Sequence, residues 1–452
     1  MTPEEYARLD GTALAQLIAR DEVSRADVLR AAYARIGEEN PRLNAVIDLY
    51  DPPVVDPSAH GSFAGVPFLL KDVGAGLAGK RTRLGSALFR DGPPQSHDDE
   101  LSLRFLKAGF AILGKTNIPE FGFNVTSEPV AFGATRNPLD VTRTPGGSSG
   151  GAAAAVASGM VPVAHATDGA GSIRIPAAAC GLVGLKPSRG LVPQGPKYTD
   201  VFGGLVVEGV VSRTVRDTAA VLDAIAGPDA GASYAAPVLK PPKDRLRIGI
   251  ITQGAADTPV SAAALAAVEE AAGVFRALGH EVAPLDLPFL PEDWAVPRQV
   301  YLAQNCAQLA ADFEGKPVPD AFEPINRAAL LLGRGMSAAA FLRIVRRGQR
   351  FARRFATAVW PNVDVLLTPA LAEPPPRLGS FPTDHDDVAL HVDRMTRIFP
   401  FAGLFNLTGG AALALPARRT AEGLPVGIQI AGDIGDDRVL LALGARYEAA
   451  TA

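Results

Sequence analysis

The sequence predicts an α/β protein in which strands and helices alternate along the chain. Short apolar runs at residues 66–70 and 110–113 have the length of buried strands. Between them, residues 98–107 carry apolar side chains at helical spacing. This alternation is typical of helices packed on a sheet. With 47% hydrophobic and 20% charged residues, the 452-residue chain can bury a large core.

The other elements follow from the same two periodicities. Residues 2–21 and 24–39 predict two helices, and Ser24 with Asp27 is a plausible start signal for the second. An Ala-rich segment from residue 150 predicts a closely packed helix. A Pro- and Lys-rich joint at 237–243 is either a domain boundary or a connection to strands that return to one sheet. Beyond the joint we expect a strand at 246–251, a helix at 261–278 and a helical region at 293–360. Three more strands are expected at 363–367, 411–416 and 426–431.

Composition excludes several classes of protein. Lys and Arg number 44 against 48 Asp and Glu, a net charge of −4, so we expect no nucleic-acid partner. Two cysteines, Cys180 and Cys306, exclude a disulfide scaffold and a Cys-rich metal site. The N-terminal residues show no signal-peptide pattern, and no apolar stretch is long enough to span a bilayer. We therefore expect a cytoplasmic protein with no membrane partner.

One motif has the form of a phosphate-binding loop. Residues 109–116 match the pattern G-x-x-x-x-G-K-[ST]. A phosphate loop needs a flexible turn between its glycines and a helix after its lysine. Here the intervening residues are Phe-Ala-Ile-Leu, which favour a strand, and Pro119 interrupts any following helix. The pattern does not predict nucleotide binding.

A second motif, Gly146 to Gly150, matches the nucleophile elbow G-x-S-x-G of α/β-hydrolases, with Ser148 at its centre. That elbow requires a buried strand directly before it. Residues 137–145 are polar and contain two prolines, which is typical of a loop. An esterase that uses Ser148 in this way is retained only as an alternative.

Two loops rich in glycine carry the strongest signal for chemistry. Ser148 and Ser172 lie 24 residues apart, each within a run of small residues. Such backbone lets main-chain N–H groups converge on a negative charge and lets a substrate approach the chain closely. The same runs also suit close packing of a helix on a sheet. Two loops with hydroxyl groups favour a catalytic site over packing alone.

A serine nucleophile needs a base. His165 lies near these loops, but its apolar surroundings are more typical of a core residue. Lys71 ends the apolar run 66–70 and is followed by Asp72, an unusual place for lysine. Burial would lower the pKa of Lys71 and leave it neutral enough to act as the base.

Together these residues resemble the amidase signature family, whose hallmark is a Ser–cis-Ser–Lys triad. The matching segments span nearly the whole chain, at residues 67–72, 114–122, 144–151, 166–187 and 423–432. Within the family, residues 168–174 and 184–190 are most similar to bacterial 6-aminohexanoate-cyclic-dimer hydrolases and aryl acylamidases. The resemblance implies one large domain over 1–452, with a central twisted mixed β-sheet covered by helices on both faces. Its expected parts are N-terminal helices at 1–60 and a catalytic core at 61–236. A strand with a helical insertion that shapes the pocket follows at 237–360, and C-terminal strands with a helix at 361–452.

The resemblance also implies the roles of individual residues. Ser172 would attack an amide carbonyl while Ser148 relays its proton to neutral Lys71, and the peptide between Gly147 and Ser148 would be cis. Water would then release the acyl group, with no cofactor and no metal. The residues expected to donate backbone N–H groups to the oxyanion are Gly169, Ala170, Gly171 and Ser172. Supporting roles are expected for Asp168 with Arg174, as an ion pair, and for Ser149, bonded to backbone.

The chain departs from the family pattern at two places. The double glycine usual before the nucleophile is Ala170-Gly171, and the usual Gly-Gln-Pro-Ala segment is replaced by residues 409–412. The substrate pocket is therefore predicted only in outline. Its expected residues are Phe121, Asn124, Asn305 and Cys306, with Tyr301 and the segments 196–204 and 399–407. Their mostly uncharged character suits a neutral or weakly polar acyl group.

Three alternatives remain beside a small-molecule amide hydrolase. The chain is also similar to an amidotransferase-type subunit, which would need partner subunits and a tRNA-linked substrate. The second alternative is a non-catalytic binding protein on the same scaffold, and the third is the esterase described above. A homodimer is also consistent with the family.

Overall fold

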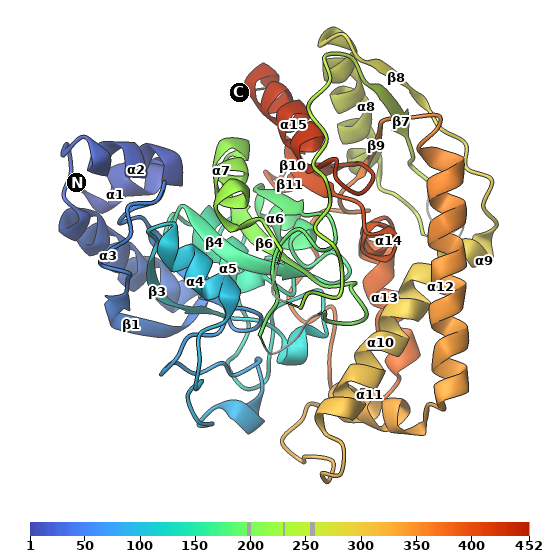
Figure 1. The fold of residues 1–452 in the computed structure, drawn as a ribbon, viewed down its shortest axis with the longest axis horizontal. Helices are drawn as coiled ribbons and strands as arrows, with labels where there is room; N and C mark the ends of the chain where they lie inside the picture. Colours follow the sequence, from blue (N-terminus) through green and yellow to red (C-terminus); the bar gives the residue numbers. More distant parts are fainter. Residues whose placement is uncertain (197–199, 229–230, 254–257, 452) are drawn as a thin grey trace.

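A single mixed β-sheet of eleven strands runs through the protein in the computed structural model (Figure 1). The structure describes residues 1–196, 200–228, 231–253 and 258–451. The strand order is β1-β3-β2-β4-β6-β5-β10-β11-β9-β7-β8. The strands are β1 (Val46–Val54), β2 (Pro67–Lys71), β3 (Ala111–Thr116), β4 (Val163–Asp168), β5 (Val183–Lys186), β6 (Val207–Ser212), β7 (Arg247–Ile250), β8 (Glu281–Pro284), β9 (Val365–Pro369), β10 (Ala412–Arg419) and β11 (Pro425–Ala431).

The middle of the sheet is buried on both faces. Every residue of β2, β3, β4, β5, β6, β9 and β11 is buried, which explains their continuous apolar runs. The pairing is mixed, because β2 lies parallel to β3 and β4 whereas β4 and β6 are antiparallel. This confirms the predicted fold class.

Helices cover the sheet on both faces. They are α1 (Pro3–Arg8), α2 (Gly11–Ala19), α3 (Arg25–Leu43), α4 (Glu100–Lys107), α5 (Gly150–Ala157), α6 (Arg174–Cys180), α7 (Val215–Ile225), α8 (Ala262–Ala277), α9 (Pro291–Trp294), α10 (Val296–Asp312), α11 (Pro324–Gly335), α12 (Ala338–Val359), α13 (Val388–Ile398), α14 (Ala402–Thr408) and α15 (Asp437–Thr451). Two short 3-10 helices are η1 (Ala87–Phe89) and η2 (Glu120–Gly122). Helices α5 and α6 pack together on one face, and α7, α8 and α15 pack on the other.

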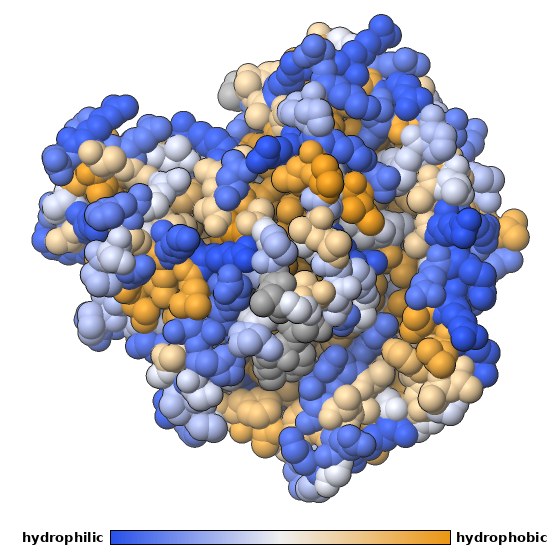
Figure 2. All heavy atoms as spheres, viewed as in Figure 1, coloured by the Kyte–Doolittle hydropathy of each residue, from blue (hydrophilic) through white to orange (hydrophobic). Residues whose placement is uncertain are grey.

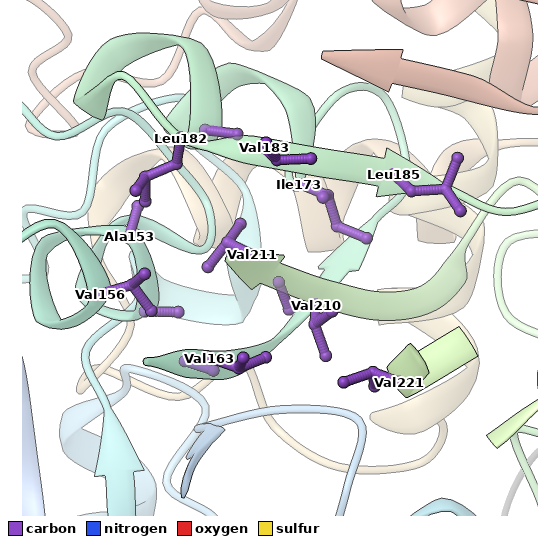
Figure 3. Close-up of a cluster of buried hydrophobic side chains, with 14 of the residues drawn as sticks. Ala153, Val156, Val163, Ile173, Leu182, Val183, Leu185, Val210, Val211 and Val221 are labelled. Carbon is purple, nitrogen blue, oxygen red and sulfur yellow. The ribbon is translucent and has the colours of Figure 1, made fainter. Parts of the chain in front are cut away.

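The core around the site is made of small and β-branched side chains. Figure 3 shows Ala153 and Val156 of α5 on one side of β4 and β6, with Val221 of α7 on the other. The run of alanines in α5 is wholly buried, and a Cβ on Gly151 would lie 2.4 Å from the backbone nitrogen of Asn117. The predicted Ala-rich helix therefore packs at close range against the segment around Asn117.

The first predicted helix, 2–21, is wrong as a single element. The chain forms α1 and α2, separated at Leu9 and Asp10, where the backbone is extended. Asp10 accepts a hydrogen bond from the N–H of Ala13 at 2.8 Å and so begins a new helix. The start signal at Ser24 is confirmed, since its side chain accepts from the N–H of Asp27 at the beginning of α3.

The joint at 237–243 connects two halves of one sheet. After it, β7 pairs with β9 and β8 at one end of the sheet, and α10 to α13 form a helical layer beside it (Figure 1). In the described part of the chain, no single helix is long and apolar enough to cross a bilayer. Helices α11 and α12, bent by 103° at their junction, pass that test of length and composition only as a pair.

The outer surface seen in Figure 2 is mostly hydrophilic, with scattered apolar side chains between the charged ones. Helix α12 presents a hydrophilic strip on this face, whereas its residues Phe351 and Phe355 are buried. The helix therefore packs with one apolar face on the rest of the protein, as its periodicity predicts.

Candidate active site

Lys71 is the last residue of β2 and is completely buried, with 0% of its surface exposed. Its Nζ atom donates to Ser148 Oγ at 2.7 Å and to Thr167 Oγ1 at 2.8 Å. Burial lowers the pKa of Lys71 to about 7, although the charges of Glu208 and Asp168 oppose the shift. A substantial fraction of this lysine is therefore neutral near pH 7.

Ser148 lies in the loop that leads into α5, and its peptide bond with Gly147 is cis. The hydroxyl of Ser127 donates to the carbonyls of Gly146 and Ser148, at 3.3 and 3.2 Å, and accepts from the N–H of Gly150 at 3.0 Å. These bonds hold the loop against the body of the protein with the Ser148 hydroxyl directed at Lys71.

Ser172 lies in the turn between β4 and α6 and is partly exposed, unlike Lys71 and Ser148. Within the described residues its hydroxyl makes no hydrogen bond. The turn begins directly after Thr167 and Asp168, the last residues of β4. Because Thr167 bonds to Lys71 and also to Ser149, the turn that holds Ser172 starts beside the lysine and beside the loop of Ser148.

The predicted set of oxyanion donors needs one correction. The N–H of Gly171 donates to Asp168 Oδ1 at 2.7 Å and is therefore not free to bind an oxyanion. In the described part of the chain, no acceptor takes the N–H groups of Gly169, Ala170 or Ser172. The carboxylate of Asp168 shapes the loop so that these three groups remain available.

The predicted ion pair between Asp168 and Arg174 is present and almost fully buried, with Arg174 Nε 2.9 Å from Asp168 Oδ2. The guanidinium also bonds to Ala402 O, to Gln429 Oε1 and to Asn406 Oδ1, so every N–H of Arg174 has an acceptor. Burial alone would raise the pKa of Asp168, but the charge and hydrogen bonds of Arg174 outweigh it and lower that pKa to about 2. The pair ties the Ser172 turn to α14 and β11.

His165 is not placed to serve as a base for either serine. Its Nδ1 accepts the backbone N–H of Lys71 at 3.2 Å, and its Nε2 lies 2.8 Å from Glu208 Oε2. Burial lowers the pKa of His165 despite the neighbouring carboxylate. The histidine supports the strand that carries Lys71, in keeping with its interpretation as a core residue.

Neither of the two competing motifs has the local structure that its pattern requires. Residues 111–116 of the phosphate-loop pattern form β3, where buried Lys115 donates to the carbonyl of Ala75 at 2.6 Å. The strand that a nucleophile elbow requires is absent from residues 137–145, all of which are described. Ser149 exchanges weak hydrogen bonds with the backbone of Thr167, at 3.3 and 3.4 Å, as expected for a structural serine.

A cavity of about 530 Å³, open to solvent, lies beside the Ser172 turn. It is lined by Ala170, Thr258, Trp294, Pro297, Arg298, Tyr301, Thr396, Phe399, Pro400, Gly403 and Leu404. Tyr301 and, from the predicted segment 399–407, residues 399, 400, 403 and 404 line this cavity. Part of the predicted loop 196–204, residues 197–199, lies outside the described residues.

The four other predicted pocket residues are not among those that line this cavity. Phe121 packs against Phe322, with ring centroids 4.7 Å apart, although its neighbour Gly122 borders Ser148. Asn124 donates to the carbonyl of Phe381 at 3.0 Å. Asn305 is buried on α10, and Cys306 is fully buried in a hydrophobic cluster, where burial raises the pKa of its thiol to about 12.

Two residues that touch the site were given no role from the sequence: Thr167 bonds to Lys71, and Glu208 pairs with His165. Asn406, within the predicted pocket segment 399–407, does not line the cavity but donates to Asp168 Oδ1 at 2.9 Å. Strand alternation gives a signal for Thr167, which shares a face of β4 with His165. Among the described residues, no group of three or more His, Cys, Asp or Glu side chains is arranged to hold a metal ion.

The sheet, the two glycine-rich turns and the buried lysine are those of a class of hydrolases that act on amides. The sequence model of the amidase family matches residues 27–441. This chain belongs to the amidase family and is an amide hydrolase.

Its relatives include two enzymes named 6-aminohexanoate-cyclic-dimer hydrolase, from Paenarthrobacter ureafaciens and Pseudomonas sp. (strain NK87). Each is 36% identical to it over 98% of this chain and 94% of the relative. The solved structure of 6-aminohexanoate cyclic dimer hydrolase complexed with substrate superposes with a TM-score of 0.91, at 32% identity over 98% of this chain and 97% of that chain. A bacterial aryl acylamidase superposes with a TM-score of 0.84, at 27% identity over 98% and 96%.

Proposed function

We propose that the protein hydrolyses a carboxylic amide through an acyl-enzyme on Ser172, with Lys71 as the base and Ser148 as the proton relay. The observation that carries this proposal is the contact of a wholly buried lysine with Ser148, next to the turn of Ser172. A lysine removed from water without a carboxylate in direct contact favours its neutral form.

The relay moves one proton at each serine. Neutral Lys71 keeps a lone pair and two N–H groups, so it accepts from Ser148 while it donates to Thr167. Ser148 in turn accepts the proton of Ser172 as the Ser172 oxygen forms a bond to the substrate carbonyl carbon. The proton returns along the same path to the amide nitrogen as the C–N bond breaks.

The free N–H groups of Gly169, Ala170 and Ser172 would stabilise the negative oxygen of the tetrahedral intermediate. A single donor of this kind contributes about 3–4 kcal/mol to the transition state. Asp168 and Arg174 act as positioning residues, because their pair fixes the turn on which these donors lie. Water then attacks the acyl-enzyme by the reverse of the same proton path and releases the acid.

The acyl-enzyme gives a direct test. Turnover of an amide in the presence of hydroxylamine is expected to yield the hydroxamate as well as the acid, because hydroxylamine competes with water for the acyl group. Rapid acid quenching followed by peptide mass spectrometry is expected to find the acyl group on Ser172. An adduct on Ser148, or hydrolysis with no hydroxamate, would contradict the mechanism.

The activity is expected to depend on pH through Lys71. Since only the neutral amine accepts a proton, kcat/KM should rise as pH increases through about 7 and fall below it. The substitution Glu208→Gln removes a negative charge that favours the ammonium form, so the pKa of Lys71 should decrease and the acid limb should move to lower pH. Buried Lys186 also has a lowered pKa but is influenced by other charges, so its titration would not respond in this way.

The measurement is the pH profile of kcat/KM for wild type and Glu208→Gln. Glutamine keeps an acceptor for His165, so the strand that carries Lys71 stays supported. Glu38→Gln, a substitution of a surface glutamate paired with Arg35, is the matched control and should leave the profile unchanged. An acid limb that stays in place or moves to higher pH in Glu208→Gln would exclude Lys71 as the base.

We propose a neutral, non-peptide amide as the substrate, linear or cyclic. The cavity walls are mainly apolar and aromatic, and the charge of Arg298 is balanced by Asp393. The relatives are named for a cyclic dimer of 6-aminohexanoate and for aryl acylamides, both of which are neutral at the amide. A hydrolysis screen across linear, cyclic, aryl and peptide amides and simple esters would define the preference.

One alternative has a specific observation in its favour. The solved structure of a glutamyl-tRNA(Gln) amidotransferase subunit from Thermotoga maritima superposes with a TM-score of 0.77, at 25% identity over 98% of this chain and 92% of that chain. A protein of that kind would show little activity on simple amides without its partner subunits. Turnover of simple amides by the isolated chain in the screen would therefore exclude it.

A further inference from the structure

Ala170 contributes to the site through both its backbone and its side chain. Its backbone N–H is one of the three free donors of the Ser172 turn, and its side chain is part of the cavity wall. Gly403, which also lines the cavity, lies in the first turn of α14. A Cβ on Gly403 would lie 4.0 Å from the Cβ of Ala170 and 3.7 Å from that of Pro297, which is ordinary van der Waals contact.

We propose that Ala170 and Gly403 together set the size of acyl group that the enzyme accepts; this inference rests on the proposed function. They are the two smallest residues of the cavity wall, while Trp294, Tyr301 and Phe399 contribute large rings. Position 170 carries one methyl group and position 403 carries none, and together they set the depth of the cavity between these rings. Removing the first methyl deepens the cavity, and adding the second fills it.

The geometry allows both changes without distortion of the backbone. Gly403 lies in the first turn of a helix and is not among the glycines with positive φ, so alanine suits its backbone conformation. Neighbouring Gly171 offers no such freedom. Its φ is +126°, and a Cβ there would lie 2.6 Å from Ile175 and 2.8 Å from Ala402. Within the Ser172 turn, position 170 can therefore vary in size and position 171 cannot.

The test compares kcat/KM for 4-nitroanilides of acetic acid and of cyclohexanecarboxylic acid. Ala170→Gly is expected to raise the ratio of the large to the small substrate by about 10-fold, the scale of one carbon in an apolar pocket. Gly403→Ala is expected to lower that ratio by a similar factor. Because the two methyl positions are in contact, the double variant should return the ratio to within about 3-fold of wild type.

Gly273→Ala is the matched control, since Gly273 lies in a helix with no atom near the added methyl, and it should leave the ratio unchanged. A glycine at position 170 also loosens the turn, but that effect would lower kcat for both substrates alike and would not be reversed by Gly403→Ala. Uniform loss without rescue would overturn the proposal. A ratio that responds only when the leaving amine is varied would overturn its assignment to the acyl group.

The outcome is separable from that of the proposed function. All ratios are taken from the turnover that Ser172→Ala eliminates. Persistence of turnover in that variant would refute the proposed mechanism, but it would not refute the proposal that Ala170 and Gly403 set the size of the acyl group. The rates at which methyl- and cyclohexylphosphonate esters label Ser172, followed by mass spectrometry, give the same comparison without turnover. Equal labelling ratios in wild type, Ala170→Gly and Gly403→Ala would overturn the inference while leaving the nucleophile established.

Discussion

Replacing Ser172 with alanine is expected to lower amide turnover on the order of 10⁶-fold while the protein stays folded. The loss should be this large because the remaining groups have no other nucleophile to serve. Ser148 is 3% exposed and bonded to Lys71, whereas Ser172 is partly exposed, in the turn whose Ala170 lines the cavity. Stability should change by less than about 0.5 kcal/mol, since within the described residues the Ser172 hydroxyl bonds to nothing. Steady-state hydrolysis and thermal unfolding measure the two effects.

Ser158→Ala provides the matched control for this variant. Ser158 is a buried serine at the end of α5, and its hydroxyl bonds to the carbonyl of Ala154 at 2.8 Å. Its removal should leave turnover unchanged. Turnover in Ser172→Ala that equals turnover in Ser158→Ala would remove Ser172 from the mechanism.

Replacing Asp168 with asparagine is expected to destabilise the protein by about 3–5 kcal/mol, because it leaves the buried charge of Arg174 without its counter-ion. Asp168 also accepts hydrogen bonds from the N–H groups of Gly171 and Ile173 and from Asn406. Asparagine cannot accept all of these bonds. Turnover should fall as well, because the Ser172 turn loses the group that holds its donors in place.

Denaturant unfolding of Asp168→Asn against wild type measures this loss. Arg30→Met breaks the pair of Arg30 with Asp27, in which the Arg30 side chain is 74% exposed, and should cost less than about 1 kcal/mol. An Asp168→Asn protein as stable as the Arg30→Met protein would show that the buried pair is not needed for the fold.

Much of the site was predictable because its signals are local in sequence. Lys71 stands out as a lysine at the end of an apolar run, and the two serines stand out in runs of glycine. The error at Gly171 has a clear cause. Whether an N–H group is free depends on how the carboxylate three residues earlier is oriented, and Arg174, Asn406 and Gln429 decide that orientation.

The pocket was predicted less well for a related reason. Asn305 and Cys306 lie on the same helix as Tyr301, and sequence alone does not say which face of α10 meets the cavity. The same limit applies at the N-terminus, where the helical periodicity of residues 2–21 continues across the break between Leu9 and Asp10. The Asp10 carboxylate caps α2 there and also bonds to Arg216, more than 200 residues away.

The sequence by itself determined the fold class and the family and supplied the candidate site residues, because periodicity, glycine placement and short motifs are properties of neighbouring residues. The tertiary structure alone decided the pKa of Lys71 and the shape of the cavity. The lowered pKa of Lys71 comes from complete burial under segments distant in the chain. Thr167 of β4 bonds to the amine, and the charge of Glu208 of β6 opposes the shift. The cavity wall likewise joins Ala170, Tyr301 and Gly403 from three separate elements. Desolvation and cavity shape depend on what the folded chain brings together, and no local pattern records that.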